Sequence, residues 1–153
     1  DLQAWLAEGA VDVILTYEAV SGGSQTIHPL PAERLVLYSN RPVTPIKSDP
    51  YYVFVDHGAD YRRRHGESYH DAGIARINFD CPSWAMDFLL ENGGSAYLPQ
   101  YMAAPHVARG ALHVVPDAPV FRRKRNLIVN DSAARNWAWF EPLVEKLKAT
   151  HPD

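Results

Sequence analysis

Residues 80–99 decide the fold of this chain and read Asp-Cys-Pro-Ser-Trp-Ala-Met-Asp-Phe-Leu-Leu-Glu-Asn-Gly-Gly-Ser-Ala-Tyr-Leu-Pro. Ser83 can cap the N-terminus of a helix, and the apolar residues that follow recur at helical spacing. They are Met86, Leu89 and Leu90. The two glycines at 93–94 end that helix, because glycine tolerates the left-handed conformation found there. Residues 96–98 are typical of a strand, which the next proline terminates. The stretch predicts a helix, a tight turn and a strand in close succession.

Strand and helix patterns alternate on both sides of this stretch. Strands are predicted for residues 11–15, 33–39, 51–55, 74–79, 111–115 and 125–130. Helices are predicted for residues 2–8, 59–70, 101–109 and 132–150. Residues 40–50 carry three prolines and favour a connector between two lobes. This alternation favours an α/β fold with largely parallel sheets.

Some of these segments carry more specific expectations. In residues 2–8 the inward face of the helix is formed by Leu2, Trp5 and Leu6. Residues 11–15 are nearly continuously apolar, as in a strand covered on both faces. Pro105 should break its helix, and Pro142 should kink the last helix or split off its first turn.

Length and composition limit the class of protein. A chain of 153 residues suits one domain or two small lobes. Apolar residues make up 46% and charged residues 22%, as in soluble globular proteins, and no apolar run approaches the ~20 residues that span a bilayer. The net charge of −3 argues against an autonomous nucleic-acid-binding domain. Cys81 is the only cysteine, which excludes an internal disulfide and is compatible with a reducing compartment.

The sequence lacks the common catalytic motifs, namely a nucleophile elbow, a phosphate loop and a dinucleotide fingerprint. Possible metal ligands are Asp56, His57, Asp60, His65 and His70, but their spacing matches no common zinc pattern. The basic runs at 62–64 and 122–125 are interpreted as solvated faces. We therefore expect no catalysis, no metal and no cofactor.

Several segments resemble signatures of the effector-binding domain of bacterial LysR-type transcriptional regulators. The helix that ends in Gly-Gly-Ser-Ala-Tyr-Leu-Pro resembles "aGxGiallP". Residues 6–15 resemble "L..G.lDvai", residues 35–38 resemble the strand that follows, and residues 110–115 resemble "g.L..v". Residues 52–58, with His65 beyond them, resemble a "yvdWG…H" variant in which His57 replaces the usual tryptophan. The resemblance covers nearly the whole chain in the family's order.

The resemblance implies a type-2 periplasmic-binding-protein-like fold, in which two Rossmann-like lobes enclose a ligand cleft. Residues 1–45 with 124–153 would form the first lobe, and residues 46–123 the second. The first residue is Asp1, and the chain opens inside the family's first helix, so it is expected to be N-terminally truncated. A strand should then be missing between residues 11–15 and 35–38. We expect a gap there, or a strand from elsewhere that fills it.

Loops after strands and the starts of helices meet at such a cleft, and this gives the candidate ligand-binding residues. The expected site consists of Thr16, Tyr17, Asp56, His57, Gly58, Tyr61, His65, Ser83 and Trp84. His57 and His65 can sense pH or hydrogen-bond an acid, and Trp84 can supply an aromatic wall. Without the resemblance, the same residues are solvated loops, a plain helix cap and surface histidines.

The resemblance implies an effector-sensing domain that binds a small, often anionic molecule and signals to an upstream helix-turn-helix domain absent from this chain. It also implies a cytoplasmic homodimer or homotetramer, formed by the helix around Trp5 and the partner's helix at 83–92. DNA would be bound only through the missing domain, so the chain alone should have no stable affinity for duplex DNA. No membrane contact is expected. The alternative is a periplasmic solute-binding protein of a transporter, and a weaker third option is an enzyme of similar architecture.

Overall fold

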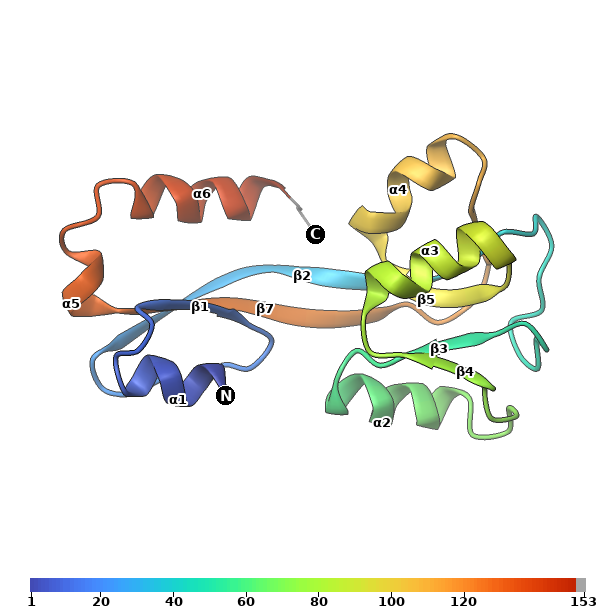
Figure 1. The fold of residues 1–153 in the computed structure, drawn as a ribbon, viewed down its shortest axis with the longest axis horizontal. Coiled ribbons are helices and arrows are strands. Elements are labelled where there is room, and N and C mark those ends of the chain that lie inside the picture. Colours follow the sequence, from blue (N-terminus) through green and yellow to red (C-terminus); the bar gives the residue numbers. More distant parts are fainter. Residues whose placement is uncertain (151–153) are drawn as a thin grey trace. The chain divides into compact units, whose positions relative to one another are not determined.

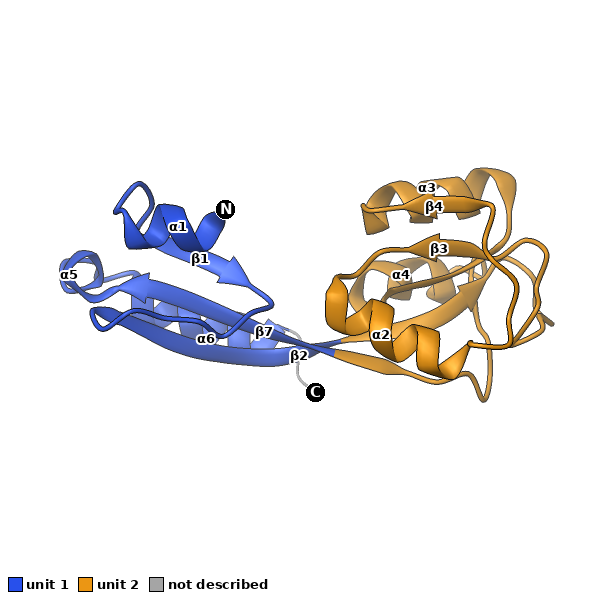
Figure 2. Cartoon of the chain, turned by 90° about the horizontal axis from the view of Figure 1, so that it is seen from below, with its two compact units in different colours: residues 1–33, 123–153 blue, residues 34–122 orange. Residues whose placement is uncertain are grey.

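The computed structural model describes residues 1–150, which divide into two compact units (Figure 2). Unit 1 comprises Asp1–Glu33 and the part of the chain that begins at Arg123. Unit 2 is Arg34–Arg122. The expected first boundary lay near residue 45, whereas the observed division lies at 33/34, inside a long strand.

Unit 1 is a small sheet with a helix on each face (Figure 1). Its elements are α1 (Leu2–Ala7), β1 (Val13–Thr16), the first part of β2 (Gln25–Ser39), most of β7 (Phe121–Asn130), α5 (Asp131–Ala134) and α6 (Phe140–Thr150). Side chains alternate along β7, so Leu127 and Val129 pack with α6, whereas Ile128 packs with Leu6 of α1. This alternation gives unit 1 an apolar layer on either side of its sheet.

Unit 2 is also layered. It contains the second part of β2, with β3 (Val53–Val55), α2 (Ala59–Ser68), β4 (Ile77–Phe79), α3 (Pro82–Asn92), β5 (Ser95–Pro99), α4 (Gln100–Ala108) and β6 (His113–Val114). Val36 and Leu98 face the core shared with α3 and α4, whereas Leu37 and Tyr97 face the core shared with Tyr61 of α2. The helices therefore cover both faces of the β2–β5 pair (Figure 1).

Helix α3 and the glycine turn after it show why residues 80–99 dominate the fold. Leu89 is fully buried, and Met86 and Leu90 pack against the same core, as predicted. Gly94 has φ +121°, and a Cβ there would lie 2.5 Å from the carbonyl oxygen of Tyr51. Only glycine fits where the turn passes that carbonyl. The expected cap is wrong, because Cys81 is the N-cap residue and Pro82 opens the helix, which leaves Ser83 within the first turn.

Strand directions differ from the prediction of largely parallel sheets, which is wrong. The pairs β1–β7, β2–β5 and β2–β6 are antiparallel, and β3–β4 is parallel. The order β1-β7-β2 places β7 between β1 and β2. The prediction that a strand from elsewhere would occupy that position is confirmed. However, Leu35–Ser39 of β2 belong to unit 2, where they pair with β5.

The structure also tests the expectations about burial and about two prolines, and those on α1, Pro105 and Pro142 are wrong. Of the three residues expected to face inward from α1, only Leu6 is buried, and Trp5 is 50% exposed. Leu15 is 46% exposed, but Val13 and Ile14 pack in the cores on opposite faces of the sheet, so β1 is covered on both faces except at Leu15. Pro105 lies inside α4 without ending it, and the break before α6 precedes Pro142. Pro142 is the third residue of α6, where the backbone N–H that it lacks has no helical partner to lose.

Candidate functional site

The carboxyl ends of β3 and β4 lie side by side and bring several expected residues to one edge of unit 2. The strands are parallel, with Val55 opposite Phe79, and the N–H of Asp56 donates to the carbonyl oxygen of Phe79 at 2.8 Å. α2 begins after Gly58, and α3 begins after Cys81. Two helix N-termini therefore follow neighbouring strands at what we call the carboxyl edge.

Asp56 is held firmly at this edge. Its carboxylate accepts hydrogen bonds from the N–H of Gly58 at 2.9 Å and from the Arg62 guanidinium at 2.6 and 2.8 Å. Partial burial favours the protonated form, but the hydrogen bonds from Gly58 and Arg62 outweigh it and hold the pKa of Asp56 below its usual value. Asp56 is thus ionised at neutral pH, and Arg62 balances its charge.

Ser83 and Trp84 open α3 at the same edge. The indole of Trp84 is 62% exposed, so its face is available to a ligand. Sγ of Cys81 and Oγ of Ser83 are hydrogen-bonded at 3.1 Å. This contact and the N–H of Trp84 lower the pKa of the Cys81 thiol. The carboxyl edge therefore combines a hydroxyl, a thiol and an aromatic surface.

His57 and Tyr61 lie in the core and not at the edge. Nε2–H of His57 donates to the carbonyl oxygen of Tyr97 at 2.8 Å, since a carbonyl oxygen can only accept. The ring of His57 packs edge-on against Tyr61 at 4.8 Å between centroids. Tyr61 is 1% exposed and packs with the buried residues of β2 and β7. The geometry gives both rings a packing role.

His65 lies farther along α2, beyond the same core. Its Nε2 is hydrogen-bonded to Oη of Tyr52 at 2.8 Å, and its ring stacks on Tyr69 at 4.8 Å. Burial lowers the pKa of His65 to about 4 and raises that of Tyr52, so both are neutral at physiological pH. Because α2 runs back from the carboxyl edge, His65 lies toward the amino ends of β3 and β4.

In unit 1, Thr16 and Tyr17 lie at the end of β1 beside a buried ion pair. Nε of Arg123 donates to Glu33 at 2.8 Å, and a second guanidinium nitrogen contacts the same carboxylate oxygen. The Arg123 guanidinium lies 3.6 Å from the ring centroid of Tyr17. Burial, then the Glu33 charge, raise the pKa of the Tyr17 phenol. Oγ1 of Thr16 accepts the N–H of Glu18 at 3.2 Å.

Sequence reasoning missed this ion pair. The run at 122–125 was interpreted as a solvated face, which is wrong for Arg123 and Arg125. Nε of Arg125 donates to the carbonyl oxygen of Pro31 at 2.7 Å. Side-chain alternation in β7 was the available signal, because it places every second residue of the run on the same face.

Comparison with known proteins places these features in a family. The family model "LysR substrate binding domain" matches residues 1–148 of the sequence. No relative was found among curated proteins by sequence comparison.

Solved structures show the same fold at low identity. The bromide-bound regulatory domain of HypT from Salmonella typhimurium has a TM-score of 0.75 at 15% identity, over 97% of this chain and 77% of that one. The reduced OxyR regulatory domain from Pseudomonas aeruginosa has a TM-score of 0.68 at 18% identity, over 96% and 77%. Full-length LysG from Corynebacterium glutamicum with bound arginine gives 0.69 at 17% identity, over 95% of this chain and 54% of that one.

The chain thus spans about half of the full-length regulators and most of their regulatory domains. Its α/β fold is of the type-2 periplasmic-binding-protein-like class. No helix within residues 1–150 is long and apolar enough to cross a membrane, and no group of three potential ligands in that range could hold a metal ion. The chain belongs to the LysR substrate-binding-domain family, the effector-sensing module of LysR-type transcriptional regulators.

Proposed function

We propose that the effector of this regulatory domain is a small anion that binds at the carboxyl edge of unit 2. The observation that carries the proposal is the parallel β3–β4 pair, which places the N-termini of α2 and α3 after adjacent strand ends. The positive ends of the two helix dipoles favour an anion there. Because Arg62 balances Asp56, that carboxylate does not repel the ligand as a bare charge would.

Ser83 and Trp84 are the side chains that we expect to contact the effector directly, with Gly58 offering backbone. His57 and Tyr61 support the loop from within the core. In unit 1, we also propose that Thr16, the last residue of β1, and Tyr17, directly after it, contact an effector. Two structural neighbours have bromide and arginine bound, so small ions and amino acids are the first probes to use.

The test is a thermal-shift screen with bromide, chloride, simple carboxylates and amino acids including arginine. We expect one class to raise Tm, and the shift to disappear in Trp84→Ala. The matched control is Trp139→Ala, which removes a tryptophan of similar exposure from unit 1 and should leave the shift intact. A shift of equal size in Trp84→Ala and the parent protein would contradict this placement of the site.

We further propose that the full protein carries a helix-turn-helix domain and works in the cytoplasm as a homodimer or homotetramer. The exposure of Leu2 and Trp5 on α1 and of Trp84 on α3 supports pairing between α1 and the α3 of another copy. Sedimentation should show association that Trp5→Ala weakens and Trp139→Ala does not. Gel-shift assays should show sequence-specific DNA binding by the full protein and none by this domain alone at physiological salt.

The solute-binding alternative is not favoured, because the structural neighbours are regulatory domains of transcription factors. The effector signal is expected to act by population shift, in which the ligand stabilises one conformation that the DNA-binding domain recognises. The measurement is DNA affinity of the full protein with and without the effector found in the screen.

A further inference from the structure

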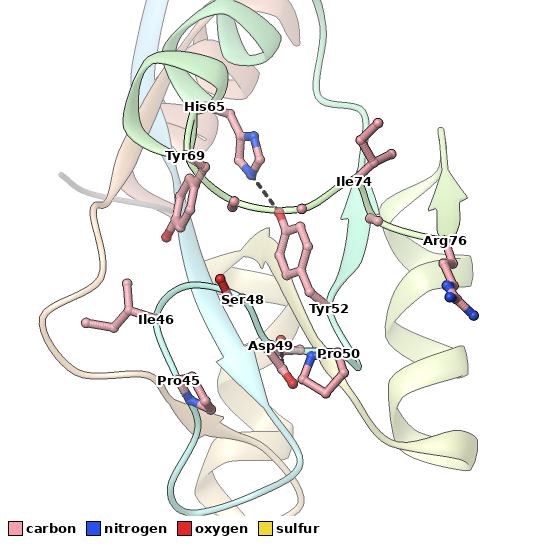
Figure 3. Close-up of a pocket in the computed structure, with 14 residues that line it drawn as sticks. Pro45, Ile46, Ser48, Asp49, Pro50, Tyr52, His65, Tyr69, Ile74 and Arg76 are labelled. Atoms are coloured by element: carbon pink, nitrogen blue, oxygen red, sulfur yellow. Dashed lines mark hydrogen bonds between the residues drawn. The ribbon is translucent and has the colours of Figure 1, made fainter.

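Unit 2 contains a cavity of about 580 Å³ at the edge opposite to the carboxyl edge (Figure 3). Its walls come from the loop before β3, from the C-terminal half of α2 and from the loop before β4. β3 and β4 are parallel, so these loops meet at the amino ends of both strands. Of the nine expected site residues, His65 alone lines this cavity in the described part of the chain. The cavity is therefore separate from the proposed effector site.

One wall of the cavity is a stack of aromatic rings. The ring of His65 lies 5.9 Å from that of Tyr52 at an interplanar angle of 12°, and 4.8 Å from that of Tyr69 at 26°. Ile46, Pro45 and Pro50 form an apolar wall from the facing loop. Nearly parallel rings facing aliphatic groups favour a flat ring as ligand, because stacking adds to the burial of apolar area.

The charges around the cavity are already balanced or directed elsewhere. The Asp49 carboxylate is almost fully buried and binds the Arg41 guanidinium, Oγ of Ser95 and the N–H of Tyr51. Burial holds His65 neutral, with a pKa of about 4. The Arg76 side chain extends away from Tyr52 and His65 (Figure 3). A ligand charge placed beside Tyr52 and His65 would lose water without gaining an ionised partner there, which is costly.

Uncharged hydrogen-bonding groups do face the cavity. Oη of Tyr52 and Nε2 of His65 form their pair in the cavity wall, and Ser48 presents its hydroxyl from the loop (Figure 3). Ser48 has φ +58°, an uncommon conformation for a residue other than glycine. The volume falls within the range of small-molecule sites, roughly 300–1,000 Å³.

We propose that this cavity binds a neutral, planar aromatic molecule of one or two rings that carries a hydroxyl or amide group. The ring stacks on Tyr52 and Tyr69, and the polar group hydrogen-bonds with Ser48 or with the Tyr52–His65 pair. Such a ligand contacts both loops that wall the cavity. An ion pair between Lys47 and Asp71, at 2.9 Å, already connects these loops. The cavity is then a second ligand site of unit 2, and binding there raises the free energy of unfolding of unit 2.

The test is calorimetric titration of the whole domain with 2-naphthol, which is neutral at pH 7, and with 2-naphthoate, which has the same rings and a negative charge. We expect 2-naphthol to bind saturably at one site and 2-naphthoate to bind about ten-fold more weakly or less, because its charge finds no partner. Equal or tighter binding of 2-naphthoate, or no binding of 2-naphthol at millimolar concentration, overturns the proposal.

Ala72→Phe fills the cavity and should weaken 2-naphthol binding by about ten-fold or more. The matched control is Ala104→Phe, at an exposed position of α4 that does not line the cavity. A second control, Trp84→Ala, changes the carboxyl edge. Both controls should keep the affinity of the parent protein for 2-naphthol. If Ala72→Phe does not fold, as judged by circular dichroism, Ala75→Phe replaces it. Unchanged binding in a folded cavity-filling variant overturns the proposal.

Discussion

The two edges of unit 2 are built from the same pair of strands but have opposite character. At the carboxyl edge, Asp56 and Ser83 are polar, Trp84 is exposed, and two helix N-termini direct the positive ends of their dipoles outward. At the amino edge, Tyr52 and His65 belong to a largely apolar cavity with uncharged polar groups. Because β3 and β4 are parallel, the N-termini of α2 and α3 both lie at the carboxyl edge. The loops before the two strands form the cavity at the amino edge.

The largest expected effect comes from Gly94, which connects α3 to β5 beside Tyr51 at the amino edge. Gly94→Ala should lower the free energy of unfolding by about 3 kcal/mol or more, because φ is +121° and the new Cβ would meet the Tyr51 carbonyl. Urea unfolding measures this change. The control is Gly66→Ala, inside α2 with open space around it, which should stabilise by about 0.5–1 kcal/mol. Equal effects would mean that the close approach at Gly94 is absent.

The next effect is a pH dependence that belongs to the amino edge. The pKa of His65 falls from 6.5 in the unfolded chain to about 4 in the folded one, because burial disfavours the charged ring. The unfolded state therefore binds more protons between these values, so the stability from this group is complete above pH 6.5 and is lost as pH falls toward 4. After allowance for partial exposure, the loss should be about 1–2 kcal/mol.

Urea unfolding at pH 7 and pH 4.5 measures this loss, and His65→Gln isolates it. The variant should lose less stability than the parent over that interval, since the other titrating groups are common to both. The same pH dependence in both proteins would show that His65 is not shielded from water.

A smaller effect is expected from the hydrogen bond between Tyr52 and His65 in the cavity wall. Tyr52→Phe keeps the ring but removes the hydroxyl that pairs with His65, so it should cost about 1 kcal/mol. It should also weaken 2-naphthol binding without affecting any ligand at the carboxyl edge. Chemical unfolding and calorimetry on the same samples separate the two effects, and a neutral result in both would contradict the assigned pair.

The smallest stability change is expected at the carboxyl edge. Trp84→Ala should change the free energy of unfolding by no more than about 0.5 kcal/mol, because the indole is mostly exposed. Effector binding should nevertheless be lost. A destabilisation comparable to that of Gly94→Ala would show that Trp84 is part of the core and leave the proposed site without its aromatic surface.

The sequence by itself determined the elements whose signals are local. The helix and turn of residues 82–94 follow from apolar spacing and two glycines, and the order of the family's segments predicted the fold class and the regulatory role. The same local reasoning placed Asp56, Gly58, Ser83 and Trp84 after β3 and at the start of α3, where the structure has them. Whether they bind the effector stays a prediction.

Only the tertiary structure decided the features that depend on residues far apart in the chain. Arg123 pairs with Glu33 across 90 positions, and β7 returns from unit 2 to lie between β1 and β2. His57 turns inward to a carbonyl 40 positions away, and the cavity joins loops that no short pattern relates. Local periodicity reports which face of an element is apolar, but not which partner covers it, because that choice is made by long-range packing and by the need to pair buried polar groups.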